Sequence, residues 1–263
     1  MLNMVKSMNP GHWMLILLIF ISSQSSCFAH TSTTYFQLKV YHFQTTEQEQ
    51  VIDRFLEKAY LPAMHRLGFK EIAIFKPIDN KDKADKLVYV FSSSANLEKY
   101  ANLDVDILKD KRYQASGKEY LEAAYNHPPY SRIETILMKA FEGMPLLSFP
   151  KLSSDKSERV YELRSYEAPT EKLSANKISM FNNGEIDIFK KLNFNAVFYG
   201  QVIAGSTMPN LIYLTTFENI TEREAHWKAF GPLYKPMAEL TQYQNNVSKN
   251  VTTLCRPTDY SDI

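Results

Sequence analysis

The sequence has few cysteines and lacks the short motifs that mark common catalytic and cofactor sites. Cysteine occurs only at Cys27 and Cys255. Because Cys27 falls in a predicted leader, the mature chain keeps one cysteine, which excludes an internal disulfide. No base is signalled beside Cys255, so we interpret it as a buried thiol and not as a nucleophile. Zinc-ligand spacings, phosphate loops and dinucleotide fingerprints are also lacking, and we expect no metal site and no cofactor.

An excess of charge of either sign is lacking too. The chain has 30 basic and 29 acidic residues, and removal of the predicted leader takes away only Lys6 among them. A mature chain with balanced charge has no long-range attraction for a phosphate backbone or for anionic lipid. We therefore expect no nucleic-acid partner and no electrostatic binding to a membrane.

The chain also has no apolar run long enough to span a bilayer near its start. The run at 14–21 has eight residues, which is too short for a transmembrane helix. It follows Lys6 and precedes a polar stretch and a small-x-small motif that ends at Ala29, so residues 1–29 are predicted to be a signal peptide. Export to the periplasm or the medium follows. The alternatives are a lipoprotein anchored to the membrane at Cys27 and an uncleaved anchor.

What the sequence does contain is an internal repeat. The run FQLKVY at 36–41 returns as YELRSY at 161–166, and RLGF at 66–69 returns as KLNF at 191–194, both at an offset of 125 positions. LVYV at 87–90 returns as LIYL at 211–214, at an offset of 124. A nearly constant offset indicates duplication of one unit. We expect one repeat at 35–142, a serine- and proline-containing linker at 143–158, and a second repeat at 159–258.

The pattern within each repeat predicts the order β-α-β-β-α-β, which is the ferredoxin-like arrangement of an α+β fold. Gly68 and Asn193, at equivalent places, are predicted to end the first helix of each repeat in the left-handed conformation. Two ferredoxin-like sheets packed face to face form a barrel of the dimeric α/β-barrel type. Two repeats could close this barrel within one chain, or each could pair across a homo-oligomer.

The second repeat, residues 160–258, resembles the NIPSNAP family. The resemblance rests on the opening YELRSY at 161–166, LNF at 192–194, MPNL-x-YL at 208–214, and HW-x-x-F at 226–230 preceded by Arg223. The first half resembles the family less, since Gln37 and Lys39 stand in place of Glu162 and Arg164. The resemblance implies a dimeric α/β-barrel fold related to cofactor-free oxygenases and isomerases, and it supplies no accepted mechanism.

The candidate site residues lie on the first strand of the second repeat and on its last helix. Glu162, Arg164 and Tyr166 share one face of the strand because side chains alternate. If the other face packs on helices, this polar face points into the barrel, where the two charges must pair with each other or hold a polar ligand. His226 is a candidate proton-transfer group, and its alternative role is a hydrogen bond at the helix start. The candidate ligand-binding residues are Tyr166, Tyr199, Tyr213 and Trp227.

Two functions fit these observations. The first is an exported barrel that binds a small molecule or a protein partner without catalysis. The second is a cofactor-independent monooxygenase or isomerase acting on a small aromatic or polyketide-like substrate, with Glu162 or His226 as base and Arg164 holding the developing oxyanion. Convergence of Glu162, Arg164 and His226 on an open cavity would favour the enzyme.

Overall fold

A computed structural model describes residues 33–263 of the chain. The predicted signal peptide at 1–29 and the candidate lipid-anchor residue Cys27 lie outside the described residues. Within 33–263, no helix combines the length and the apolar character needed to cross a membrane.

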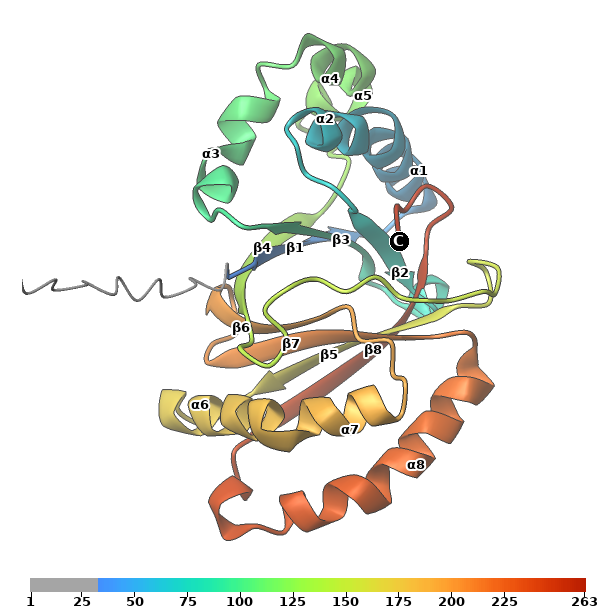
Figure 1. Ribbon diagram of the computed structural model, residues 1–263. Coiled ribbons are helices and arrows are strands. Elements are labelled where there is room, and N and C mark those ends of the chain that lie inside the picture. The colour runs from blue at the N-terminus through green and yellow to red at the C-terminus, as the bar shows by residue number, and fades with distance from the viewer. Residues whose placement is uncertain (1–32) are drawn as a thin grey trace, which may run out of the picture. The chain divides into compact units, whose positions relative to one another are not determined.

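The first half contains four strands and two groups of helices (Figure 1). The elements follow in the order β1 (Tyr35–Phe43), α1 (Thr46–Phe55), the π-helical segment η1 (Leu56–Tyr60), α2 (Leu61–Arg66), β2 (Ala73–Pro77), the 3₁₀ turn η2 (Asn80–Asp82), β3 (Lys86–Ser94), α3 (Glu98–Ile107), α4 (Lys111–Ser116), α5 (Lys118–Leu121) and β4 (Arg132–Ala140). Thr45 caps α1 by accepting a hydrogen bond from the backbone N–H of Gln48, which explains why this helix begins before its first apolar residue.

The second half runs through the same types of element. They are β5 (Val160–Glu167), α6 (Glu171–Met180), the π-helical segment η3 (Phe181–Glu185), α7 (Ile186–Lys191), β6 (Phe198–Ala204), β7 (Asn210–Phe217), α8 (Ile220–Ala238), the 3₁₀ turn η4 (Thr241–Tyr243) and β8 (Lys249–Pro257). Asn219 caps α8 through its side-chain oxygen, which accepts from the backbone N–H of Glu222.

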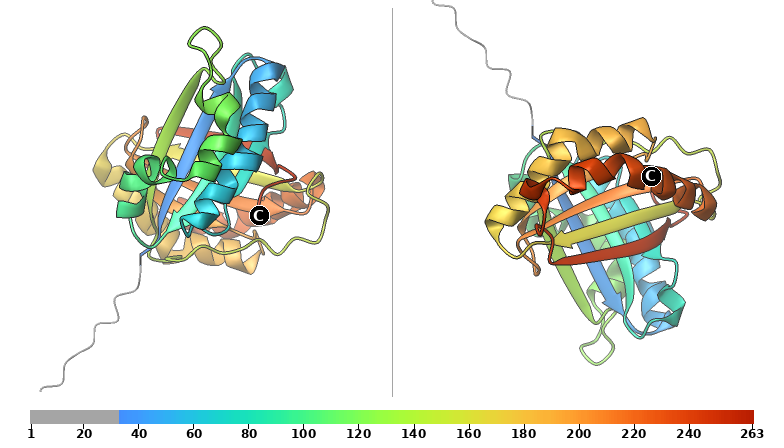
Figure 2. Two further views of the ribbon diagram at one scale, coloured as in Figure 1. Left: turned by 90° about the horizontal axis from the view of Figure 1, so that it is seen from above. Right: turned by 90° about the horizontal axis from the view of Figure 1, so that it is seen from below.

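All eight strands form one closed antiparallel barrel in the order β1-β3-β2-β8-β5-β7-β6-β4. Each half supplies four adjacent strands, and the two sheets join where β2 pairs with β8 and where β4 pairs with β6. The barrel therefore closes within a single chain and needs no second copy. Helices α1 to α5 cover the outer face of the first sheet, and α6 to α8 cover that of the second (Figures 1 and 2).

The interior of the barrel is filled with apolar side chains from both halves. Phe36 and Phe91 of the first half pack on Phe198 of the second, and the rings of Phe91 and Phe198 stack with centroids 4.4 Å apart. Tyr161 and Leu163 also belong to this interior cluster. Such packing is expected of an eight-stranded barrel, whose interior is just wide enough for side chains to fill.

The predicted orientation of the first strand of the second repeat is therefore wrong. The apolar face of β5, which includes Tyr161 and Leu163, points into the barrel, whereas Glu162, Arg164 and Tyr166 lie on the outer face beneath the helices. The physical reason is that a closed, dry barrel cannot solvate a charged pair, while the helix-covered face borders an open pocket.

Two backbone features recur at the offset that the sequence indicated. The π-helical segments η1 and η3 are separated by 125 positions at both ends. Gly68 and Asn193 both have positive φ, at 80° and 55°, as predicted for the ends of these helices. The strand register, however, pairs Tyr41 with Val88 and Tyr166 with Leu211, an offset of 123. The letter match at an offset of 124 is thus one residue out of register.

Candidate functional site

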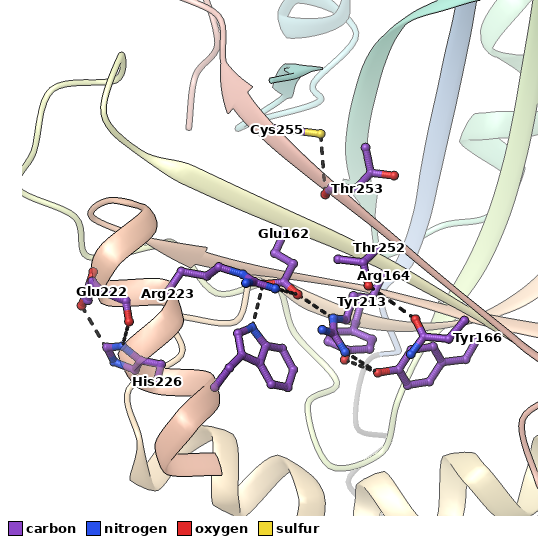
Figure 3. Close-up of polar contacts among 12 residues, drawn as sticks. Glu162, Arg164, Tyr166, Tyr213, Glu222, Arg223, His226, Thr252, Thr253 and Cys255 are labelled. Atoms are coloured by element: carbon purple, nitrogen blue, oxygen red, sulfur yellow. Dashed lines mark hydrogen bonds and ion pairs between the residues drawn. The ribbon is translucent and has the colours of Figure 1, made fainter. Parts of the chain in front are cut away.

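Glu162 is the centre of a hydrogen-bonded network between β5 and α8 (Figure 3). Its side chain is 0% exposed. Arg164 Nε donates to Glu162 Oε1 at 2.6 Å, and Arg223 donates from Nε to Oε2 at 2.7 Å and from Nη2 to Oε1 at 3.1 Å. Trp227 Nε1 also donates to Oε2, at 2.7 Å. Two guanidinium groups face one carboxylate, so this cluster carries one net positive charge.

These contacts make Glu162 a poor proton acceptor. Burial acts to raise the pKa of Glu162, but hydrogen bonds from Arg223, Trp227 and Arg164 and the charge of Arg164 outweigh it, so the pKa is lowered. A carboxylate that is buried, ionised and held by three side chains anchors α8 to the sheet. It is not placed to take a proton from a substrate.

Arg164 is the charged member of this network that reaches an open pocket. Its Nη1 donates to the hydroxyl of Tyr166 at 2.9 Å, which in turn is 2.8 Å from the hydroxyl of Tyr213. The guanidinium lies 3.9 Å from the centroid of the Trp227 ring, in a cation–π contact. Its remaining nitrogen, Nη2, has no hydrogen bond within residues 33–263. Arg164 is therefore held in place by neighbours while retaining N–H groups for a ligand.

The pocket has a volume of about 500 Å³ and opens between α8, the outer face of β5 and β8, and the segment before β8. Its lining consists of Arg164, Tyr166, Lys177, Glu185, Trp227, Phe230, Tyr234, Asn245, Asn246, Val247 and Asn250. The view from below shows that no helix in the described part of the chain covers β8 (Figure 2, right). Small-molecule sites commonly combine such aromatic walls with a few polar groups.

A second ion pair, Lys177–Glu185, forms the back of the same pocket. Lys177 Nζ donates to Glu185 Oε2 at 2.8 Å and to the hydroxyl of Tyr234 at 3.1 Å. The two charged side chains are 4% and 3% exposed. Burial raises the pKa of Glu185, and the neighbouring Lys177 offsets only part of this effect. Burial likewise lowers the pKa of Lys177, but Glu185 and Tyr234 outweigh it and the net shift is upward.

The local backbone explains why these two residues meet. Side chains eight positions apart on a regular α-helix differ by about 80° in direction. The segment η3 inserts an extra residue, with Asn183 and Gly184 outside helical geometry, and this brings Glu185 back to the face that carries Lys177. The apolar spacing in the sequence did not predict this contact between Lys177 and Glu185.

The structure brings together only some of the residues named from the sequence. Arg164, Tyr166 and Trp227 line the pocket, and the hydroxyl of Tyr213 is hydrogen-bonded to that of Tyr166. Sequence reasoning missed Lys177, Glu185, Arg223 and Tyr234, all of which contribute polar contacts here.

His226 and Tyr199 lie elsewhere. His226 Nδ1 donates to the backbone carbonyl of Glu222 at 2.8 Å, and its ring packs against Phe194 and Phe217. The convergence with Arg164 that would favour the enzyme is therefore not found (Figure 3). Tyr199 is buried among aromatic rings and borders a different pocket, of about 600 Å³, beside the linker.

Comparison with known families finds a match in the second half of the chain. Residues 161–262 match the NIPSNAP family model. This confirms the resemblance that the strand and helix motifs of that half predicted, and the residues that line the pocket described above all lie within the matched segment. None of the curated proteins compared with this chain matches it.

Solved structures of similar fold cover most of the chain. A monooxygenase-like protein of Lactobacillus acidophilus has a TM-score of 0.56 at 11% identity, with 86% of this chain and 94% of the other covered. A monooxygenase-like protein of Fusobacterium nucleatum has a TM-score of 0.56 at 8% identity, covering 86% and 92%. An anthrone oxidase-like protein has a TM-score of 0.51 at 8% identity, with the same coverage. At these identities the likeness establishes the ferredoxin-like α/β-barrel fold and not an activity.

Proposed function

We propose that this chain is an exported α/β-barrel protein that binds a small organic anion in the pocket beneath α8. The observation that carries the proposal is Arg164, whose guanidinium is fixed by Glu162, Tyr166 and Trp227 yet keeps an unbonded nitrogen at an aromatic-walled opening. The net positive charge of the Glu162 network favours a carboxylate or an enolate over a cation.

The contrast between the two halves supports a functional role for this pocket. We infer that the chain arose by duplication, because strands, π-helical segments and left-handed residues recur at nearly the same spacing. At the offset of 125, the first half has Ile52 and Tyr60 where the second has Lys177 and Glu185. Because the first half folds with uncharged residues at these positions, the fold itself does not require a buried ion pair there. Such a pair is rarely more stabilising than apolar packing.

The alternative function is a cofactor-independent monooxygenase or isomerase. The fold likeness to monooxygenase-like proteins is compatible with it, but both bases considered for it are unsuited. Glu162 is held ionised by three donors, and His226 lies away from Arg164. The binding function therefore has the stronger support.

Native mass spectrometry of the protein purified from its own host tests the proposal. We expect the wild-type protein to retain a small anionic ligand, and the Arg164→Gln variant to lose it. The Lys228→Gln variant is a matched control, because Lys228 is an exposed cation of α8 that does not line the pocket. Retention of the same ligand by Arg164→Gln, or absence of any ligand together with no binding of added aromatic carboxylates, would contradict the proposal.

A further inference from the structure

We propose that the pocket selects organic acids that carry a hydroxyl group, with Glu185 Oε1 as the acceptor of that hydroxyl. This inference rests on the proposed function, because it assumes that Arg164 holds the acidic group of the same ligand. It adds a second polar contact and a chemical class, a hydroxyaryl acid.

The first observation is the unequal use of the two oxygens of Glu185. Oε2 accepts the 2.8 Å bond from Lys177, whereas Oε1 has no hydrogen bond within residues 33–263. The side chain is only 3% exposed and borders the pocket. Oε1 is not among the fully buried side-chain atoms that lack a partner, so it keeps access to the pocket, where a ligand hydroxyl can donate a charge-assisted hydrogen bond to it.

The second observation is that the ammonium group of Lys177 has no hydrogen left for Glu185 Oε1. Lys177 Nζ contacts Glu185 Oε2, the Tyr234 hydroxyl at 3.1 Å and Met180 Sδ at 3.5 Å. No hydrogen of this ammonium group is left for Glu185 Oε1. Because Lys177 already balances the charge of Glu185, the missing partner is a neutral donor such as a hydroxyl and not a second cation.

The third observation concerns the body of the ligand. Tyr166, Trp227, Phe230 and Tyr234 supply aromatic walls in the pocket that holds Arg164 and Glu185. Flat apolar walls with an anion-binding group and a hydroxyl acceptor fit an aromatic ring that carries both substituents.

Isothermal titration with substituted benzoates tests the inference directly. The probes are benzoate, 3- and 4-hydroxybenzoate, and 3- and 4-methylbenzoate, in which a methyl group of similar size replaces the hydroxyl. We expect at least one hydroxybenzoate to bind wild-type protein about tenfold or more tightly than its methyl counterpart, as a hydrogen bond to a charged acceptor provides.

Two variants locate the acceptor. The double variant K177M/E185L removes both charges with little change in volume, and in it the hydroxyl-to-methyl affinity ratio should approach one. E185Q keeps the shape but weakens the acceptor, and the ratio should fall by about threefold or more. Equal binding of hydroxy- and methylbenzoates by the wild type, or an unchanged ratio in both variants, would overturn the inference.

The Arg164→Gln variant separates this inference from the proposed function. If that variant binds all probes as well as the wild type, or if no probe binds the wild type, the anion site itself fails and the inference fails with it. If Arg164→Gln weakens every probe while the wild type shows no preference for the hydroxyl, only the role of Glu185 is overturned.

Discussion

At the residue scale, Glu162 and not Arg164 is the group on which the network depends. The sequence predicted that Glu162 and Arg164, which share one strand face two residues apart, would pair with each other or hold a polar ligand. It could not predict Arg223 and Trp227, which lie 61 and 65 positions away and meet Glu162 only because α8 crosses β5. Because Arg223 and Trp227 belong to α8, the polar site lies on the helix-covered face of β5 and not in the barrel interior, where it was expected.

The unequal number of partners predicts unequal costs of substitution. Glu162→Ala leaves two partly buried guanidinium groups, 15% and 20% exposed, and an indole N–H without their acceptor, and we expect a loss of about 3–5 kcal/mol in the free energy of unfolding. Arg164→Met leaves Glu162 bonded to Arg223 and Trp227, so its cost should be about 1–3 kcal/mol. Urea unfolding of both variants measures the difference. Equal losses of unfolding free energy in the two variants would show that Arg223 does not stabilise Glu162 when Arg164 is removed.

The lowered pKa of Glu162 predicts a particular acid sensitivity. A carboxylate whose pKa is depressed on folding contributes stability that is fully present above its unfolded pKa, about 4.3, and that is lost as pH falls through the folded value. We therefore expect the stability of the wild type to fall more steeply below about pH 4.3 than that of Glu162→Gln. Urea unfolding at several pH values between 7 and 3 compares the two slopes, and identical slopes would contradict the depressed pKa.

At the scale of elements, the first helix of each half shows what periodicity can and cannot predict. The apolar spacing and the residues Gly68 and Asn193 were sufficient to place the helix and its end. The π-helical segments were not predicted, because one inserted residue alters a helical pattern too little to be read from spacing alone. The pairing of Lys177 with Glu185 depends on that inserted residue, so this part of the site was missed.

The ion pair of α6 and η3 predicts a non-additive response to substitution. Lys177→Met alone leaves Glu185 buried without its cation and should cost about 3–5 kcal/mol, whereas K177M/E185L removes both charges and should be neutral or stabilising. The first half supports this expectation, since Ile52 and Tyr60 occupy the equivalent positions. Chemical unfolding of the single and double variants gives the coupling free energy. A double variant as unstable as the single would mean that the pair is required for the fold.

The linker between the halves is fixed by another carboxylate, Glu218, just before α8. Its side chain accepts hydrogen bonds from the backbone N–H groups of Ser153 and Ser154 at 2.7–3.0 Å and from the Ser153 hydroxyl at 3.1 Å. Hydrogen bonds from Ser154 and Ser153 lower the pKa of Glu218 to about 2. Glu218→Ala should release this segment and increase tryptic cleavage after Lys151 or Lys156. Glu224→Ala, an exposed acid of α8, serves as the control. An unchanged rate of cleavage in Glu218→Ala would contradict the role of Glu218 in fixing the linker.

At the scale of the whole molecule, the order of strands and helices predicted an α/β barrel, but side-chain alternation along β5 did not predict which of its faces points inside. The order β-α-β-β-α-β appears in both halves, and two ferredoxin-like sheets do form a barrel. Alternation divides β5 into two faces, yet Tyr161 and Leu163 could equally have packed on helices. The choice depends on the other sheet, whose Phe36 and Phe91 are complementary to the apolar face of the second half, and no local pattern carries that information.

The shared interior predicts that neither half folds alone and that the two halves reassemble. Fragments 33–150 and 151–263 each supply one wall of the barrel, and a separated fragment would expose the apolar face that contains Phe36 and Phe91 or Phe198. We expect each fragment alone to aggregate or lack a cooperative unfolding transition, and the co-expressed fragments to copurify with a transition like that of the intact chain. Phe198→Ala should weaken this assembly strongly, because it removes the ring that stacks on Phe91 across the two sheets. Leu233→Ala is the control on the outer surface, where the side chain is partly exposed. Independent, cooperative folding of either fragment would show instead that the ferredoxin-like halves are autonomous and that the barrel is only their mode of docking.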